Sequence, residues 1–286
     1  MTETTDAARP NYGARERLQR AMRRGKYLVG RDPALLPILL RLTPLGLSRK
    51  ITGSTSLVVE GFPRGGNTFM VFVLQDAVDH ALRISSHCHL PAQVKHAVHL
   101  GIPTVLVVRE PVELLASYLV YGPHATAAEV LKEYTTYHRQ LVPYLEQLLV
   151  VDFEEITTDM SAVIARINER YHLGIPNWEH SQDNVQRIFA DIDAHHAMVH
   201  PRLEHHRGVP HPSHLKDEAK EQYRAELLSP HNTALRVSAQ QAYGYFSRAR
   251  TERRHRQAGE PDAGFSSPVR RLRSGLGGGF SGVDDG

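Results

Sequence analysis

The segment Val58–Phe69, VVEGFPRGGNTF, carries residues whose types and spacing predict an anion-binding loop. Gly61, Gly66 and Thr68 have the spacing of a phosphate loop that joins a strand to a helix. Backbone N–H groups and the positive end of the helix dipole converge on an anion at such a loop. The nucleoside-triphosphatase pattern needs a lysine before the threonine, and here that residue is Asn67. Because the lysine normally reaches the β- and γ-phosphates, we expect a smaller anionic group than a triphosphate.

Five consecutive residues of this loop are candidate ligands of the anion. Gly65 and Gly66 allow close approach of the backbone and positive φ angles. Asn67 and Thr68 can donate side-chain hydrogen bonds, and Arg64 supplies a positive charge.

A second candidate site lies in residues 105–118, VLVVREPVELLASY. The apolar run ends at Arg109, and Ser117 follows eight residues later. A guanidinium at the carboxyl end of a strand lies where doubly wound folds bind ligands, and it can hold a phosphate through two hydrogen bonds. The alternative is a surface arginine paired with Glu110 or Glu113. The upstream loop favours the phosphate site.

These segments, together with residues 87–93, HCHLPAQ, resemble sulfotransferases that use 3′-phosphoadenosine 5′-phosphosulfate (PAPS). Residues 61–69, GFPRGGNTF, look like that family's 5′-phosphosulfate loop, written P-K-S-G-T-T-W or P-R-S-G-N-T. Arg109 and Ser117 match both positions of its 3′-phosphate-binding segment. The HCHLPAQ segment is similar to the family's T-H-L-P segment, which implies that His89 is the catalytic histidine.

The resemblance extends from about Leu57 to Phe246. VVDFEEITTDM, residues 150–160, is similar to the family's YEDL strand end. HHRGVPHPSHL, residues 205–215, resembles the late Arg-Gly loop that closes over the nucleotide, which implies that Arg207 and Gly208 bind it.

Three further residues keep alternative interpretations. Phe69 follows the loop where the family often has an aromatic residue, which implies a contact with adenine, but it can equally be a core residue beside Phe72 and Val73. Asp152 or Glu154 could orient the base or the acceptor, or simply cap the next helix, so neither is assigned a catalytic role.

The resemblance implies transfer of a sulfuryl group from PAPS to a hydroxyl or amine of a small-molecule, carbohydrate or lipid acceptor. His89 would be the base, because an imidazole titrates near neutral pH. Arg64, where many family members have lysine, would stabilise the transferring group without giving up a proton. No metal is expected, because backbone amides and the side chains of Arg64, Arg109 and Ser117 would take the charge of the leaving nucleotide.

Other classes of function stay open. A magnesium-dependent phosphotransferase of the phosphate-loop type would need another cation in place of the lysine, with Asp152 holding the metal. A catalytically silent sulfotransferase-like protein could bind an acidic partner through its arginine-rich ends. Residues 195–214 contain many histidines, but their spacing is irregular and H-E-x-x-H is absent, which favours a polar loop over a zinc site.

The elements that position these residues follow from the hydrophobic pattern, in which short apolar runs alternate with helical segments from Leu57 onward. This alternation predicts an α/β fold of three layers, with a mainly parallel sheet between helices, and the resemblance implies the P-loop-like sulfotransferase fold. The predicted strands are Leu57–Gly61, Leu82–Ser85, Thr104–Val108 and Leu148–Asp152. The predicted helices are Asn67–His80, Val112–Val120, Ala127–Glu146 and Met160–His172.

The hydrophobic pattern changes in the last third of the chain. After Gly174 we expect irregular structure to about Ser213, apart from a short helix near Asp183–Ala190. Two helices should follow, over residues 215–227 and 232–246.

Three regions are therefore predicted. Residues 1–50 form a basic helical extension packed on the core, 51–250 the sulfotransferase-like α/β domain, and 251–286 a disordered Arg/Gly-rich tail. Residues 14–31 hold seven Arg or Lys and one Glu, which suits a solvated helix or peripheral contact with an anionic membrane.

The composition limits which ligands, covalent links and cellular locations suit the chain. The formal net charge is +3 and the pI is about 9.0, which suits anionic ligands without indicating nucleic acid. Cys88 is the only cysteine, which excludes an intrachain disulfide and a cysteine-rich zinc site. The apolar residues 33–47 are interrupted by Pro37, Arg41 and Pro44, so we expect a cytoplasmic protein that can also lie peripherally at a membrane. Its oligomeric state is open.

Overall fold

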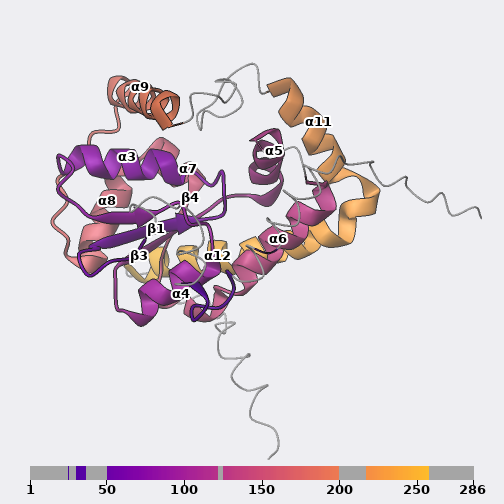
Figure 1. Ribbon diagram of the computed structural model, residues 1–286, viewed down its shortest axis with the longest axis horizontal. Helices are drawn as coiled ribbons and strands as arrows, with labels where there is room; N and C mark the ends of the chain where they lie inside the picture. The colour runs from indigo at the N-terminus through magenta and orange to yellow at the C-terminus, as the bar shows by residue number, and fades with distance from the viewer. Residues whose placement is uncertain (1–24, 26–29, 37–49, 122–124, 200–216, 258–286) are drawn as a thin grey trace, which may run out of the picture.

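The computed structural model describes residues 25, 30–36, 50–121, 125–199 and 217–257, and its centre is one parallel sheet (Figure 1). Four strands pair in the order β2-β1-β3-β4, and every pairing is parallel. The strands are β1 (Leu57–Gly61), β2 (Ile84–Ser86), β3 (Thr104–Val108) and β4 (Leu149–Asp152). The structure confirms the α/β class, and each predicted strand is present within two residues of its expected bounds.

Helices connect and cover these strands. The α-helices are α3 (Asn67–Ala77), α4 (Pro91–His99), α5 (Pro111–Tyr121), α6 (Ala127–Arg139), α7 (Phe153–Thr158), α8 (Met160–Tyr171), α9 (Gln182–Val199), α11 (Asp217–Leu228) and α12 (Thr233–Gln257). Two short 3₁₀ turns, η2 (Val142–Tyr144) and η4 (Pro230–Asn232), link neighbouring elements.

The two faces of the sheet bury separate hydrophobic clusters. Val105 and Val107 of β3 pack with α3, α8 and α9, whereas Leu106 and Val108 pack with α4, α5, α6 and α12. Figure 1 accordingly shows α3, α8 and α9 on one side of the strands and α4, α6 and α12 on the other. Aliphatic strands buried on both faces are typical of a parallel sheet between two helical layers. The three-layer arrangement is therefore confirmed.

The order of the strands determines where a ligand should bind. β1 has β2 on one side and β3 on the other, so the connections leaving these strands diverge at their carboxyl ends. In doubly wound sheets this switch point forms the crevice that binds ligands. Gly61 pairs with Val107 at the ends of β1 and β3, which brings the loop after Gly61 next to Arg109.

Helix α6 is shorter than predicted, and α4 was not predicted at all. The expected helix Ala127–Glu146 ends at Arg139, and a 3₁₀ turn containing Pro143 follows. Proline inside a helix lacks the N–H donor and clashes with the carbonyl four residues earlier, which explains the early end. Helix α4 begins at Pro91, the first position where proline is favoured in a helix.

Helix α9 corrects the prediction for the region after Gly174. The structure has 18 helical residues where the sequence predicted a short helix near Asp183–Ala190. Ile188 and Ile192, one turn apart, are both buried in the cluster that includes α3. Tertiary packing thus stabilises a helix whose polar composition favours irregular structure.

Helix α12 corrects the predicted start of the disordered tail. It continues through Thr251 to Gln257. Arg250, just before this extra part, forms an ion pair of 3.0 Å with Glu155 at the start of α7. This contact anchors the end of α12 to the sheet edge.

Most of the predicted basic extension, including 14–24 and 26–29, lies outside the described residues. Leu36, which is described, clusters with Cys88, Leu90 and Ala92 beside α4. Within the described ranges, none of the helices combines the length and the apolar character needed to cross a membrane.

Candidate anion-binding site at the carboxyl ends of β1 and β3

The loop after β1 is tight, and glycine is needed at both of its ends. A Cβ atom on Gly61 would lie 2.4 Å from the carbonyl oxygen of Val107. Gly66 has a φ of +103°, and a Cβ there would lie 2.6 Å from Cδ1 of Ile156. Arg64, between them, also has a positive φ of 70°. The strand, loop and helix are therefore closely packed, which fits the spacing seen in the sequence.

The amino terminus of α3 faces this loop without a side-chain cap. Gly66 is the N-cap residue, and it has no side chain to accept a hydrogen bond from the first turn. The first backbone N–H groups of a helix have no partner inside the helix, and they carry the positive end of its dipole. This terminus can therefore donate hydrogen bonds to an anion.

Two arginines and a serine converge beside the loop, as the sequence predicted. Nη1 of Arg109 donates to the carbonyl oxygen of Arg64 at 3.2 Å. Nε of Arg64 donates to Oγ of Ser117 at 3.3 Å. The guanidinium of Arg109 lies 3.7 Å from the ring centre of Phe153, which supports it from one side. Residues separated by 45 and 53 positions thus form one positively charged group.

Burial and mutual repulsion make this group receptive to negative charge. Burial lowers the pKa of Arg64 to about 10; the nearby Tyr121 opposes this shift and Arg109 adds to it. Burial also lowers the pKa of Arg109, although Glu113, Glu110 and Asp152 oppose the shift. Both guanidinium groups remain charged at neutral pH, so an anion between them would relieve their repulsion.

The carboxylates near Arg109 are committed to other partners. Glu110 accepts a hydrogen bond from the backbone N–H of Glu113 at 2.8 Å. Glu113 itself pairs with Lys220 and Arg224, at 2.8 and 2.7 Å. Among the described residues, no carboxylate is within ion-pair distance of Arg109. The alternative of a surface arginine paired with Glu110 or Glu113 is therefore not observed.

His89 lies against the loop in a defined orientation. Its Nδ1 is 2.8 Å from the carbonyl oxygen of Gly61, and the amide of Asn67 also approaches both atoms at 3.4 Å. A carbonyl oxygen can only accept, so Nδ1 must carry the hydrogen. The neutral ring then has its lone pair on Nε2, the nitrogen that can accept a proton.

The preceding histidine contacts the other side of the loop. Nε2 of His87 is 3.0 Å from Oγ of Thr68, and the rings of His87 and His89 meet edge to face, with centres 5.7 Å apart. Both histidines have positive φ angles, 63° and 55°. The sequence did not indicate a role for His87.

Glu60 is a second residue that sequence reasoning missed. Its side chain is fully buried in β1, and its two oxygens accept hydrogen bonds from the backbone N–H groups of Cys88 and His89, at 2.8 and 2.9 Å. A charged residue inside the apolar run of a predicted buried strand was the available signal.

Phe69 has a structural role, and two other candidates are not among the described residues. Phe69 is 8% exposed and packs with Trp178, His180 and Phe189, so the structure favours its role as a core residue over contact with adenine. The predicted nucleotide contacts Arg207 and Gly208 lie outside the described residues.

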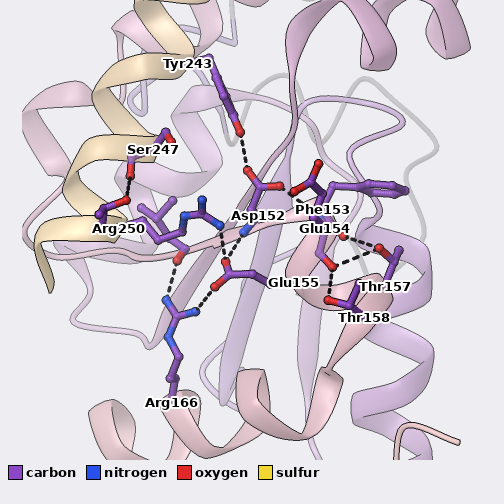
Figure 2. Close-up of polar contacts among 12 residues, drawn as sticks. Asp152, Phe153, Glu154, Glu155, Thr157, Thr158, Arg166, Tyr243, Ser247 and Arg250 are labelled. Atoms are coloured by element: carbon purple, nitrogen blue, oxygen red, sulfur yellow. Dashed lines mark hydrogen bonds and ion pairs between the residues drawn. The ribbon is translucent and has the colours of Figure 1, made fainter. Parts of the chain in front are cut away.

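Asp152 at the end of β4 serves as a structural link. Figure 2 shows its carboxylate between α7 and α12, where Oδ1 accepts from the backbone N–H of Glu154 at 3.0 Å and Oδ2 from the hydroxyl of Tyr243 at 2.6 Å. The capping alternative for Asp152 is therefore the one observed.

A comparison with known protein families and a search of curated proteins find no match to this chain. The family resemblance accordingly remains a prediction that rests on the motifs themselves. Among the residues that the structure describes, no three His, Cys, Asp or Glu side chains form a group that could hold a metal ion.

Proposed function

We propose that this protein is a PAPS-dependent sulfotransferase. The observation that supports the proposal most strongly is the convergence of Arg64, Arg109 and Ser117 beside the uncapped amino terminus of α3. These groups lie at the switch point of a parallel sheet, where α/β folds bind ligands. An adenine nucleotide with two separate anionic groups matches two neighbouring sources of positive charge, the α3 terminus and the arginines.

The donor supplies an activated sulfuryl group on a 5′-phosphate. In the proposal, the N–H groups at the start of α3 bind the 5′ anionic end, and Arg109 with Ser117 binds the 3′-phosphate. Arg109 has the positive charge and the planar donors that suit a phosphate, and its guanidinium packs over the ring of Phe153 at 3.7 Å.

His89 takes the proton of the acceptor in this scheme. The hydrogen bond from Nδ1 to the Gly61 carbonyl orients the ring and leaves Nε2 to accept the proton. The acceptor oxygen or nitrogen forms its bond to sulfur as the bond from sulfur to the phosphate oxygen breaks. Negative charge then develops on the leaving phosphate, where Arg64 and the α3 dipole stabilise it.

The acceptor and the cellular location are part of the same proposal. A hydroxyl or amine of a small molecule, carbohydrate or lipid would reach the donor beside His89. A cytoplasmic location with peripheral membrane contact through residues 14–31 would give access to lipid acceptors, as the basic composition of that segment suggests.

The magnesium-dependent phosphotransferase is supported less well. Its metal ligand was expected to be Asp152, whose oxygens accept hydrogen bonds from Glu154 and Tyr243 instead. These contacts already give the Asp152 carboxylate a structural role between α7 and α12.

The test is turnover of PAPS carrying ³⁵S with a panel of hydroxyl and amine acceptors, including lipid vesicles. The proposal predicts acceptor-dependent transfer of label in the absence of magnesium, and loss of about 100-fold or more in kcat for His89→Gln. His99→Gln, at an exposed position on α4, is the matched control. Full turnover by His89→Gln would remove His89 from the mechanism, and no transfer to any acceptor would contradict the proposal.

A further inference from the structure

Glu60 is an unusual residue for its place in the fold. It lies in the strand Leu57–Gly61, where every residue is buried, and its own side chain is 0% exposed. A buried carboxylate is costly unless hydrogen bonds and nearby charge compensate for its lost hydration. An aliphatic residue would satisfy the sheet equally well. The carboxylate therefore calls for an explanation beyond packing.

Its contacts are directed at the turn that carries His89. Oε1 accepts from the N–H of Cys88 at 2.8 Å, and Oε2 accepts from the N–H of His89 at 2.9 Å. A carboxylate suits this pair because it only accepts, whereas an amide would turn its NH₂ group toward one of the two donors. The turn is strained, since His87 and His89 have positive φ angles, and strain of this kind persists only where surrounding contacts enforce it.

The same carboxylate also acts on the His89 ring. Oε2 of Glu60 lies 4.0 Å from Nδ1 of His89, and the side chain of His89 is 19% exposed. The other titratable groups around the turn are His87, Cys88 and Tyr137. The ring centre of His87 is 5.7 Å from that of His89. Burial raises the pKa of Tyr137, and electrostatic interactions with Glu60 and Cys88 add to this shift. Glu60 is the carboxyl group of this set, and its Oε2 lies within 4.0 Å of the His89 ring.

We propose that Glu60 is the positioning residue for His89. Its carboxylate holds the turn so that Nδ1 of His89 donates to the Gly61 carbonyl, and its negative charge stabilises the imidazolium that forms when Nε2 takes a proton. The proposal rests on the proposed function only in one respect, namely that the proton taken by Nε2 comes from the acceptor of the sulfuryl group. The orientation and the protonation of the ring are properties of the protein itself.

The direction of the effect follows from the sign of the charge. A negative charge within about 4–6 Å favours the protonated form of an imidazole and raises its pKa, commonly by ~1–3 units. Glu60→Gln removes that charge and keeps the size of the side chain. We therefore expect the pKa of His89 to fall by roughly 1 unit or more in this variant.

The experiment is an NMR titration of the full chain with ¹⁵N-labelled histidine, in which the His89 signals are identified by their loss in His89→Gln. In the wild type, the neutral ring should be protonated at Nδ1. Glu60→Gln should lower the pKa of His89 and give a mixture of tautomers. The control is Ser85→Ala, which removes another buried hydrogen bond nearby, from Gln93 at 2.9 Å, and should leave His89 unchanged.

Two results would overturn the proposal. One is a wild-type His89 protonated at Nε2 when neutral, a result that does not depend on Glu60→Gln and therefore holds even if that variant does not fold. The other is a folded Glu60→Gln protein in which the pKa and tautomer of His89 match those of the wild type.

Activity measurements separate this inference from the proposed function. For an active enzyme, Glu60→Gln should lower kcat and shift the acid limb of the pH profile to lower pH, while the affinity for adenosine 3′,5′-bisphosphate stays unchanged. If no sulfuryl transfer is found but the NMR titration gives the expected result, the positioning role of Glu60 stands and the assigned reaction fails.

Discussion

At the scale of single residues, Gly66 is one position where the loop after β1 depends on the absence of a side chain. A Cβ there would lie 2.6 Å from Ile156 and 2.9 Å from the ring of Phe153, the same ring that supports the guanidinium of Arg109. The steric need for glycine is thus linked to the geometry of the candidate phosphate site.

We expect Gly66→Ala to lose about 1–3 kcal/mol of stability, because both the positive φ and the contacts oppose a side chain. The measurement is urea denaturation with a comparison of midpoints at equal m-values. The matched control is Gly101→Ala, where φ is also positive, at 68°, but no atom lies within 4 Å of the added Cβ. Equal losses in the two variants would show that the contacts with Phe153 and Ile156 are unimportant.

Substitutions of Arg64 test whether this residue contributes to the reaction through its charge or through proton transfer. Because Arg64 acts through its charge in the proposed reaction, Arg64→Lys should retain part of the activity and Arg64→Ala should lose most of it. Single stabilising donors of this kind commonly contribute ~100- to 1,000-fold in kcat. Equal turnover by wild type and Arg64→Ala would exclude Arg64 from the mechanism.

The local patterns and the family resemblance predicted Arg64, Arg109 and Ser117 as one site, and the structure brings these three residues together. Glu60 and His87 were missed. Their contacts join residues separated by 28, 29 and 19 positions, and they depend on how the turn before α4 folds back onto the first loop. A local pattern cannot indicate such a contact.

At the scale of elements, α6 carries a histidine that links stability to pH. His138 is fully buried among Phe62, Tyr134, Tyr137 and Phe246, and its Nδ1 donates to the carbonyl of Tyr134 at 2.9 Å. Burial lowers its pKa from 6.5 to about 4, although this hydrogen bond opposes the shift. The ring is therefore neutral in the folded protein over a pH range where it is charged in the unfolded chain.

Between pH 6.5 and about 4 the unfolded chain binds the additional proton, so stability should fall as the pH is lowered through this window. The contribution of one group is at most about 1.4 kcal/mol per pH unit. His138→Phe should flatten this part of the curve of unfolding free energy against pH, measured by urea denaturation. His99→Gln, at an exposed position, should leave the slope as in the wild type. A slope that is the same in His138→Phe and in the wild type would contradict the buried neutral ring.

The elements show what hydrophobic pattern can and cannot predict. The strands Leu57–Gly61 and Thr104–Val108 were predicted to the residue, because their apolar runs are short and bounded by turns. Helix α9 was not, because only two of its residues, Ile188 and Ile192, are buried and its stability depends on a partner distant in sequence. Packing of this kind is decided by tertiary structure.

At the scale of the whole molecule, the α/β domain ends later than the composition suggests. Helix α12 reaches Gln257, and three of its side chains contact the elements that follow the strands: Gln240 meets Glu110, Tyr243 meets Asp152 and Arg250 meets Glu155. Figure 2 shows the last two contacts side by side at the edge of the sheet. The helix thus braces the carboxyl ends of β3 and β4.

Truncation should locate this boundary. A chain ending at Gln257 should keep the melting temperature of the full chain to within a few degrees, whereas a chain ending at Ser247 loses the ion pair of Arg250 with Glu155 and should be about 1–3 kcal/mol less stable. Differential scanning calorimetry compares the two. Equal stability of the two truncated chains would mean that the end of α12 contributes nothing to the domain.

The measurement that tests the central claim most directly is calorimetric titration with adenosine 3′,5′-bisphosphate, beside ATP with and without magnesium. We expect magnesium-independent binding of the bisphosphate that weakens roughly 10- to 100-fold in Arg109→Ala, as for loss of a charged hydrogen bond. Arg139→Ala, at an exposed position on α6, should bind like the wild type. Magnesium-dependent binding of ATP with no response to the bisphosphate would contradict the sulfotransferase assignment and indicate a phosphotransferase.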